Sequence, residues 1–319
     1  MLTNVRINDI LYYINEKGYI LTSGGFNMPS YKTHSIHGEL VFNDMEKRID
    51  LDLEDLKSFS MGPDTLILPD KKAFDIAHKY RVRDYFEMIL KRIKEEKLLD
   101  NKEVMAFLYG QLDHFILDAI THPLIYYMTE GEKSTHKIKP HGLCEMWIDD
   151  YIMNLYDTWE LFYYKKKEIN DSKLKDIITD VYSNVYNVHD AGNSYEKGIK
   201  AMALFDSLIR RNLIGIVPLA TFLANTGDII SRKNNNRVED YINSERGIWY
   251  NPETLEMFND SFFDLFIKAK DISLETIEDV NRYLYDDRLL TTPFIVCNVS
   301  YNTGINCDLG QHFKRIRKN

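Results

Sequence analysis

The stretch YGQLDHFILDAITHP, Tyr109–Pro123, carries the pattern that decides the fold. His114, Asp118 and His122 follow one another at four-residue intervals, with apolar residues between them. At 3.6 residues per turn, each step of four drifts by only about 40° around a helix, so the three side chains share one face. Two imidazoles and a carboxylate on one stripe are a metal-ligand set in chemical type and in spacing. The stretch therefore predicts a helix that carries a metal site, with Asp118 placed to bridge two ions.

A second stretch, KPHGLCEMWIDD, presents another histidine and carboxylate pair. His141 and Glu145 stand four residues apart, directly after Pro140, a residue suited to the first turn of a helix. Asp149 continues the same stripe, and we interpret it as a group that supports a ligand or the fold rather than one that binds metal itself. The pattern predicts a second helix that presents another histidine and carboxylate pair.

Three further candidates lie upstream, and each is weak alone. YKTHSIHGELVF places His34 four residues before Gly38, SMGPDTLIL places Asp64 on a Gly-Pro turn, and DIAHKYRVRDYF places His78 at an expected helix start. A single histidine is more often a packed or surface residue than a ligand. The set is stronger, because five of the nine histidines fall in one ordered series that ends at Glu145.

Helical periodicity dominates the rest of the chain and predicts an all-α fold, a single multi-helix bundle with long loops and a buried metal cluster. Apolar residues recur at three- and four-residue intervals in Val82–Lys97, Asn101–Thr121, Pro140–Tyr156, Lys173–Val188, Tyr195–Asn212, Pro252–Ala269 and Ser273–Asp286. No linker or repeat divides the chain, so we expect one domain over 1–319, with the metal-ligand region at 34–145 and a helical C-terminal half at 160–319. Residues 290–319 lose the periodicity and are expected to wrap the bundle.

Composition limits the cellular setting and the partners. Hydrophobic residues make up 44% of the chain and aromatic residues 13%, enough for a sizeable core. Three cysteines, Cys144, Cys297 and Cys307, leave one unpaired in any disulfide scheme. The N-terminus shows no secretory signal, and the longest apolar run, Leu213–Ala224, is too short to span a bilayer and suits a buried helix. We therefore expect a cytoplasmic protein with no transmembrane segment. The net charge of -9 would repel nucleic acids, so we expect no stable nucleic-acid complex.

The ordered series resembles the zinc-dependent phospholipase C family, relatives of the fungal single-strand nucleases, in its bacterial intracellular members. The matching positions, in the family's order, are His34, Asp64, His78, His114 with Asp118, His122, and His141 with Glu145. The resemblance extends to T-H-x-x-x-G from Thr33, G-P-D from Gly62, H-K-x-R-x-x-D-Y-F from His78, and W-Y-N-P from Trp249.

The resemblance implies a cluster of two or three zinc ions. Asp64, His78, His114 and Asp118 would hold one ion, His122, His141 and Glu145 a second, and His34 with the bridging Asp118 a third. In secreted members the backbone of an N-terminal tryptophan also holds the third ion, but all three tryptophans here follow His34. Either the site holds two metals, or water, substrate or His37, three residues along the same helical face, completes the third site.

The same resemblance implies hydrolysis of a phosphodiester substrate by a metal-bound hydroxide, because zinc lowers the pKa of bound water to about 7. Asp118 would hold that hydroxide between the metals. Asp64 would orient or deprotonate it, since a loop position lets it lean between metal and solvent, or it would serve only as a ligand. Both are the expected catalytic residues.

Three functions remain open from the sequence. The family name implies attack on the glycerol side of a phospholipid phosphodiester, for which a rim of exposed apolar side chains is expected around the cluster. A nuclease or nucleotide phosphodiesterase would use the same metals with stacking aromatic residues nearby. A non-catalytic, metal-stabilised binding protein would unfold on chelation and turn over no ester.

Overall fold

The structure is a computed structural model that describes residues 31–129, 141–156, 168–210 and 240–310. Within these ranges it is an all-α fold with one two-stranded hairpin, as the periodicity predicts. Its elements are α2 (Tyr31–Asp44), α3 (Leu53–Phe59), the 3-10 helix η1 (Gly62–Leu66), α4 (Lys71–Ala77), α5 (Val82–Glu95), α6 (Lys102–Thr129), α7 (His141–Leu155), α8 (Ser172–Tyr186), α9 (Ala191–Arg210), β1 (Trp249–Tyr250), β2 (Met257–Phe258), α11 (Phe262–Tyr285), α12 (Pro293–Val296) and the 3-10 helix η2 (Cys307–Leu309).

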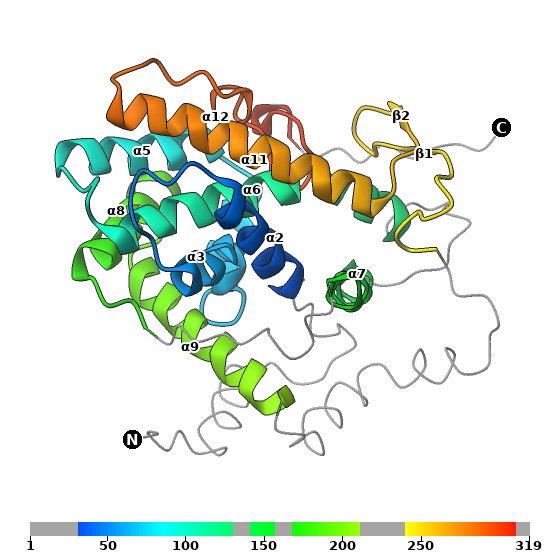
Figure 1. Cartoon of the computed structure of the whole chain (residues 1–319), viewed down its shortest axis with the longest axis horizontal. Coiled ribbons are helices and arrows are strands. Elements are labelled where there is room, and N and C mark those ends of the chain that lie inside the picture. The colour runs from blue at the N-terminus through cyan, green and yellow to red at the C-terminus, as the bar shows by residue number, and fades with distance from the viewer. Residues whose placement is uncertain (1–30, 130–140, 157–167, 211–239, 311–319) are drawn as a thin grey trace.

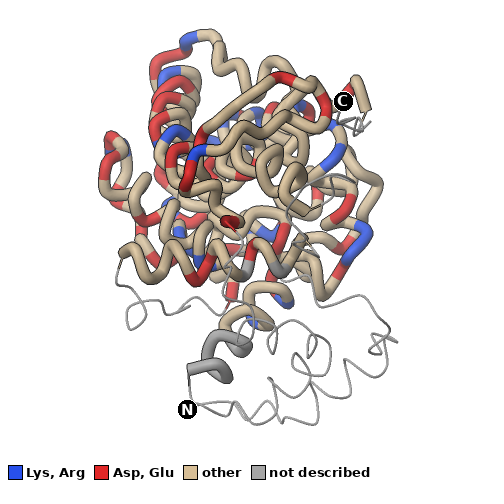
Figure 2. The backbone as a smooth tube through the Cα atoms, turned by 90° about the vertical axis from the view of Figure 1, so that its right-hand side faces the viewer, with Lys and Arg blue, Asp and Glu red and all other residues tan. Residues whose placement is uncertain are grey.

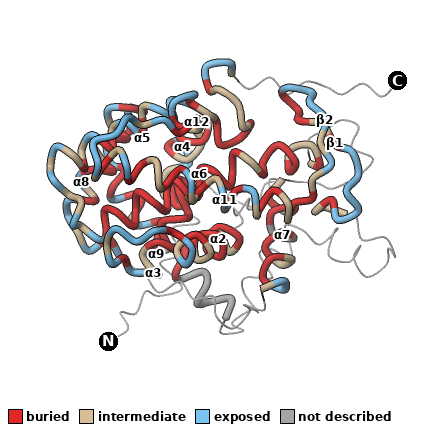
Figure 3. Tube along the Cα trace, turned by 45° about the horizontal axis from the view of Figure 1, so that its top comes forward, coloured by how far each residue is buried: buried red, intermediate tan, exposed pale blue. Residues whose placement is uncertain are grey.

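Helix α6 forms the centre of the fold. It runs for 28 residues with Pro123 inside it, and nearly every residue from Glu103 to Ile125 is buried. A helix that is apolar on all sides must be covered on all sides, and α2, α3, α7 and α11 pack around it. Figure 1 shows α11 lying along α6, and Figure 3 shows α6 buried over most of its length. The histidines of α6 are therefore held inside the core.

Helix α11 corrects one prediction. The ranges Pro252–Ala269 and Ser273–Asp286 were expected to be two helices, but a single helix spans Phe262–Tyr285 because no glycine or proline interrupts it. Its start is fixed by a capping box, in which the Ser261 hydroxyl accepts from the Asp264 N–H and the Asp264 carboxylate accepts from the Ser261 N–H. Pro252 lies instead in the turn between β1 and β2.

Three helices near the start of the described chain do not follow from the apolar periodicity. Helices α3 and α4 have seven residues each and begin at aspartate caps, where Asp52 accepts from the Glu54 N–H and Asp70 from the Ala73 N–H. Helix α2 is rich in residues with low helix propensity, and its start is held by a side chain from another helix, Asp149 of α7. These ends depend on tertiary or single-residue contacts rather than on a repeating apolar face.

The C-terminal segment does more than wrap the bundle. After α12, residues 298–307 form a tight loop closed by a bridge between Val299 and Asn306, and Tyr301 within it is only 2% exposed. The Tyr301 ring packs against Phe115 of α6, so the loop contacts the central helix. The predicted buried helix at Leu213–Ala224 lies outside the described residues.

Charged side chains, thiols and apolar helices are distributed as follows in the described residues. Acidic and basic residues are interspersed along the described backbone (Figure 2). Cys144 and Cys307 are buried free thiols and Cys297 is an exposed one. Among the described helices, none combines the length and the apolar character needed to cross a bilayer.

Candidate metal centre

The structure brings all eight predicted ligand residues together in three sets. In each set the candidate donor atoms lie within 4.8 Å of one another. The sets are His34, His114 and Asp118; Asp64, His78 and His114; and His122, His141 and Glu145. Seven of the eight side chains are buried, and His141 is partly exposed. Segments separated by more than a hundred residues in the sequence therefore meet along one face of α6.

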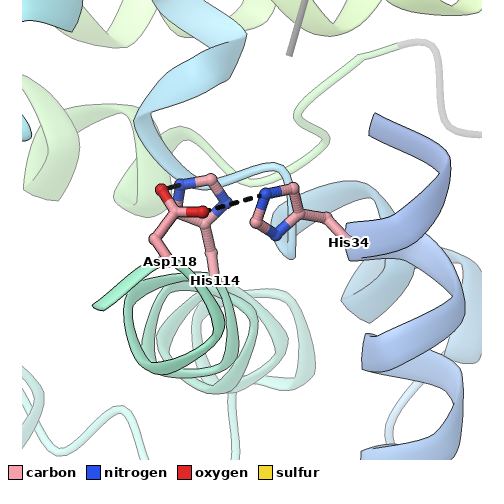
Figure 4. Close-up of side chains that lie close together, drawn as sticks. All are labelled: His34, His114 and Asp118. Atoms are coloured by element: carbon pink, nitrogen blue, oxygen red, sulfur yellow. Dashed lines mark ion pairs between the residues drawn. The ribbon is translucent and has the colours of Figure 1, made fainter. Parts of the chain in front are cut away.

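Asp118 lies between the first two sets. Its Oδ1 is 3.2 Å from His34 Nε2, and its Oδ2 is 3.2 Å from His114 Nε2 and 3.9 Å from His78 Nε2. Figure 4 shows the carboxylate of Asp118 and the rings of His34 and His114 turned toward one another from α6 and α2. The two oxygens thus face two different groups of imidazoles, the geometry expected of a bridging carboxylate.

The third set lies one turn further along α6, where α7 meets it. Glu145 Oε1 is 3.0 Å from His141 Nε2 and 3.4 Å from His122 Nε2. His122 Nδ1 is 3.7 Å from Asp118 Oδ2, so the third set adjoins the first two. The ring of Tyr126, one helical turn beyond His122, lies 4.6 Å from the His141 ring and covers one side of this set.

Backbone carbonyls orient three of the imidazoles. His78 Nδ1 lies 2.8 Å from Phe74 O and His114 Nδ1 lies 3.1 Å from Ser60 O. His122 Nδ1 lies 3.0 Å from the Tyr301 carbonyl oxygen. A carbonyl oxygen can only accept, so each Nδ1 carries the proton and donates it, and each Nε2 is turned toward the carboxylates. Carbonyl contacts of this kind fix the tautomer of metal-binding histidines.

His78 and Asp64 do not occupy the local structures predicted for them. His78 caps the C-terminal end of α4 rather than starting a helix, because the next helix begins only at Val82. Asp64 belongs to η1 and is 4% exposed, so it does not lean from a loop toward solvent. Its Oδ1 lies 3.0 Å from His78 Nε2.

A buried polar network holds η1 against α6. Gly62 has φ +51°, and a side chain there would meet the His114 ring at 2.3 Å, so only glycine permits this approach. Tyr195 of α9 donates to the Gly62 carbonyl at 2.9 Å and accepts from Gln111 Nε2 at 2.8 Å. The Tyr85 hydroxyl donates to Gln111 Oε1 at 2.9 Å. Asp64 is therefore positioned by contacts that the G-P-D motif alone does not reveal.

Electrostatics in the centre favour charged pairs over neutral ones. Burial lowers the pKa of His122, but the carboxylates of Asp118 and Glu145 outweigh it and raise that pKa to about 9. Burial raises the pKa of Glu145, but His141 and His122 bring it down to about 2. The pKa of Asp118 lies well below its ordinary value because three imidazoles oppose the effect of burial. The carboxylates of Asp118 and Glu145 are thus ionised at neutral pH, and a cation beside them would be stabilised.

His114 behaves differently from its neighbours. Burial, together with repulsion from His34, lowers its pKa below the ordinary value, so this imidazole stays neutral. Its Nε2 is buried and has no hydrogen-bond partner among the described residues, although Asp118 Oδ2 is 3.2 Å away. A neutral, unpartnered nitrogen between two carboxylates fits a cation better than a proton. Imidazole and carboxylate donors are the usual ligands of zinc, so the residues present fit this metal.

His37 does not complete a third site. It is fully buried, with Nδ1 2.6 Å from Asp113 Oδ1 and Nε2 3.2 Å from the Phe266 carbonyl. These contacts use both ring nitrogens, and the ring packs edge-on against Phe266 of α11. His37 therefore links three helices as a structural residue, and the interpretation of it as a ligand is wrong.

Asp149 holds the start of α2 and, with it, His34. Its Oδ1 accepts from the Thr33 N–H at 2.8 Å and from the Thr33 hydroxyl at 2.7 Å, and its Oδ2 accepts from the Lys32 N–H at 3.4 Å. Burial raises the pKa of this carboxyl to about 7 despite these bonds. It acts as a cap supplied by another helix.

We expect Asp149→Asn to flatten the dependence of stability on pH. Between pH 4 and pH 7 the folded state binds the Asp149 proton more tightly than the unfolded chain does, so its stabilising effect, present at pH 4, is lost as the pH rises through about 7. The loss amounts to at most about 4 kcal/mol. Urea unfolding of both proteins from pH 4 to pH 8 in excess chelator measures the difference, and parallel curves would contradict the assignment.

Tyr301 and Tyr126 are the site residues that the sequence analysis missed. Tyr301 packs its ring against His78 at 5.3 Å and Phe115 at 4.7 Å, from a segment far from the ligand series. No sequence pattern pointed to Tyr301, because it lies in a run without apolar periodicity. Tyr126 follows His122 by four residues, so the spacing that groups His114, Asp118 and His122 also contained it.

Comparison with known families agrees with this geometry. A family model described as "Zinc dependent phospholipase C" matches residues 33–198, more than half of the chain. Searches among curated proteins and among solved structures gave no match. The matched region includes every residue of the three sets. From its sequence and the side chains it brings together, the chain belongs to the zinc-dependent phospholipase C family.

Proposed function

We infer that the protein is a zinc-dependent hydrolase of phosphodiester bonds. The observation that carries this proposal is the arrangement around Asp118, whose two oxygens face imidazoles of two adjoining candidate metal sets. Divalent ions bound in adjoining sites supply water of lowered pKa and stabilise the charge that develops on phosphoryl oxygens. Membership of the family supports zinc as the metal and a phospholipid as the type of substrate.

The residues divide into roles by their geometry. Asp64, His78, His114 and Asp118 would hold one ion, and His122, His141 and Glu145 a second. Among the described residues, His34 and Asp118 provide two side-chain donors beyond the shared His114, and we propose that water or substrate completes the shell of a third ion. We propose Asp118 and Asp64 as the catalytic carboxylates, with Asp64 accepting a proton from the attacking water or orienting it.

The partly exposed third set marks the side from which substrate would enter. His141 is the least buried of the eight candidates, with 20% of its side chain exposed, and Tyr126 stands beside it. Substrate phosphate would reach the carboxylates past these two rings. The free cysteines are compatible with the reducing cytoplasm that the sequence predicts.

Metal analysis combined with an assay tests the proposal. The full chain, purified without added metal, should contain two or three zinc ions and should hydrolyse bis(p-nitrophenyl) phosphate in a chelator-sensitive manner. Phosphatidylcholine vesicles, dinucleotides and single-stranded DNA then separate the phospholipid, nucleotide and nuclease alternatives. Bound zinc without turnover of any ester would favour the non-catalytic binding protein. Absence of zinc would contradict the proposed metal centre.

A further inference from the structure

The C-terminal loop (Asn298–Cys307) lies against the metal centre although it falls outside the region matched by the family model. It touches the segments of two candidate ligands. The Tyr301 carbonyl oxygen accepts from His122 Nδ1 at 3.0 Å, and the Ser300 hydroxyl donates to the His78 carbonyl oxygen at 3.3 Å. The Tyr301 ring fills the space beside His78 and His114, at 5.3 Å and 5.8 Å between centroids.

The loop is a rigid unit rather than a loose cover. The Ser300 N–H donates to Ile305 O at 2.7 Å, the Gly304 N–H to Ser300 O at 3.1 Å, and the Cys307 N–H to Asn298 O at 2.8 Å. Asn298 Oδ1 in turn accepts from the Arg83 N–H at 3.0 Å, which ties the loop to the start of α5. Because hydrogen-bonded residues lie on both sides of Tyr301 in the sequence, the Tyr301 carbonyl can fix the direction of the hydrogen bond that it accepts.

Gly304 sets how closely the loop approaches α6. Its φ is +67°, and a Cβ at this position would lie 2.5 Å from the Ala119 carbonyl oxygen, closer than real Cβ contacts come. Ala119 follows Asp118 and precedes His122 by three residues on α6. Any side chain at residue 304 must therefore push the loop, and with it the Tyr301 carbonyl, away from His122.

Comparison of the three carbonyl-bound histidines isolates the loop's contribution. His78 and His114 take their carbonyl partners from Phe74 and Ser60, within the matched region. His122 takes its partner from Tyr301, a hundred residues beyond the end of that region. The set of Asp64, His78 and His114 thus receives its orienting carbonyls from inside the matched region. The set of His122, His141 and Glu145 receives one from outside it.

We propose that the C-terminal loop (Asn298–Cys307) is a positioning element of the metal centre, in which the Tyr301 carbonyl fixes the Nδ1–H tautomer of His122 and directs its Nε2 at the metal shared with His141 and Glu145. The proposal rests on the proposed zinc site. Loss of a contact of this kind weakens metal binding by about 10- to 100-fold. The third set is affected most, because His78 and His114 keep the carbonyl partners of their own Nδ1 atoms.

Gly304→Ala in the full-length protein is the test, and Gly310→Ala is its matched control. Gly310 also has a positive φ, +70°, but lies three residues after the loop, so Gly310→Ala introduces backbone strain outside the turn that holds Tyr301. Competition between Zn²⁺ and a chromogenic chelator gives the affinity of each zinc. We expect Gly304→Ala to weaken one zinc 10- to 100-fold, and Gly310→Ala to leave every zinc within about twofold of the unsubstituted protein.

His122→Gln separates the possible failures. Combined with Gly304→Ala it should cause no further loss of zinc, because both changes act through one imidazole. Additional loss in the double variant, or normal zinc affinity in Gly304→Ala, would overturn the role of the loop. If His122→Gln alone leaves all zinc binding intact, the third set is not a metal site, and the proposed second zinc fails rather than the role of the loop.

A measurement on the unsubstituted protein covers the case in which Gly304→Ala does not fold. In the zinc-loaded chain labelled with ¹⁵N-histidine, the His122 signals, identified by their loss in His122→Gln, should show a protonated Nδ1 and a metal-bound Nε2. The opposite pattern, with Nδ1 on the metal, would overturn the proposal regardless of any variant.

Discussion

Asp118→Asn should lower hydrolysis of bis(p-nitrophenyl) phosphate by at least about 10³-fold, a loss at the upper end of those seen when one charge-stabilising group is removed from an active site. The change replaces one of two oxygens that face different imidazoles by an amide nitrogen, which cannot donate electrons to a cation. It also removes a negative charge from between His34, His114 and His122. Both effects weaken metal binding, so zinc content should fall together with turnover.

Asp287→Asn is the matched control for Asp118→Asn. It makes the same chemical change at a side chain that is 90% exposed, in an ion pair with Lys94. Surface pairs of this kind contribute little, so activity and zinc content should stay unchanged. Normal turnover in Asp118→Asn would contradict the placement of Asp118 at the shared corner of the two sets, whatever its zinc content.

Removal of zinc should lower the temperature of unfolding by more than about 10 °C. Each ion that binds only the folded state adds about 4 kcal/mol at a thousandfold excess over its dissociation constant. Two ions would therefore add about 8 kcal/mol, and each kcal/mol moves the midpoint by about 1.5 °C in a chain of this size. Differential scanning fluorimetry with chelator, and again after zinc is restored, measures the shift.

The shift of the unfolding midpoint caused by removal of zinc should become smaller as the pH falls. Zinc must displace the proton that His122 holds up to about pH 9, so binding to the third set releases a proton at neutral pH and weakens in acid. Magnesium, which prefers oxygen ligands, should not restore the midpoint in place of zinc. A midpoint that chelator leaves unchanged at every pH would show that no tightly bound metal stabilises the fold.

Much of the site could be predicted because its core is local. His114 and Asp118 lie one turn apart on α6, and His141 and Glu145 one turn apart on α7, so helical spacing alone places each pair on a face. The helical fold followed from the same periodicity. Residues that approach from short elements were harder, since a pattern of four-residue steps carries no information about η1 or about the end of α4.

The errors have one physical cause, which is that tertiary contacts decide local structure where propensity is weak. His37 shares a helix with His34, yet both of its ring nitrogens are hydrogen-bonded, to the Asp113 carboxylate and the Phe266 carbonyl. Asp64 follows a glycine and a proline typical of loops, yet the contacts of Tyr195 and His114 with Gly62 bury it. Tyr301 belongs to an aperiodic run, and only the folded chain shows that its carbonyl reaches His122.

The cap that Asp149 places on α2 also bears on the order of folding. The cap and the helix it holds are more than a hundred residues apart in sequence, so α2 cannot draw on this contact until α7 has docked. Helix α6, by contrast, gathers three candidate ligands on one continuous segment. During folding, the three α6 ligands would therefore be arranged first. His34 would join them only in a later step, when α2 docks together with α7.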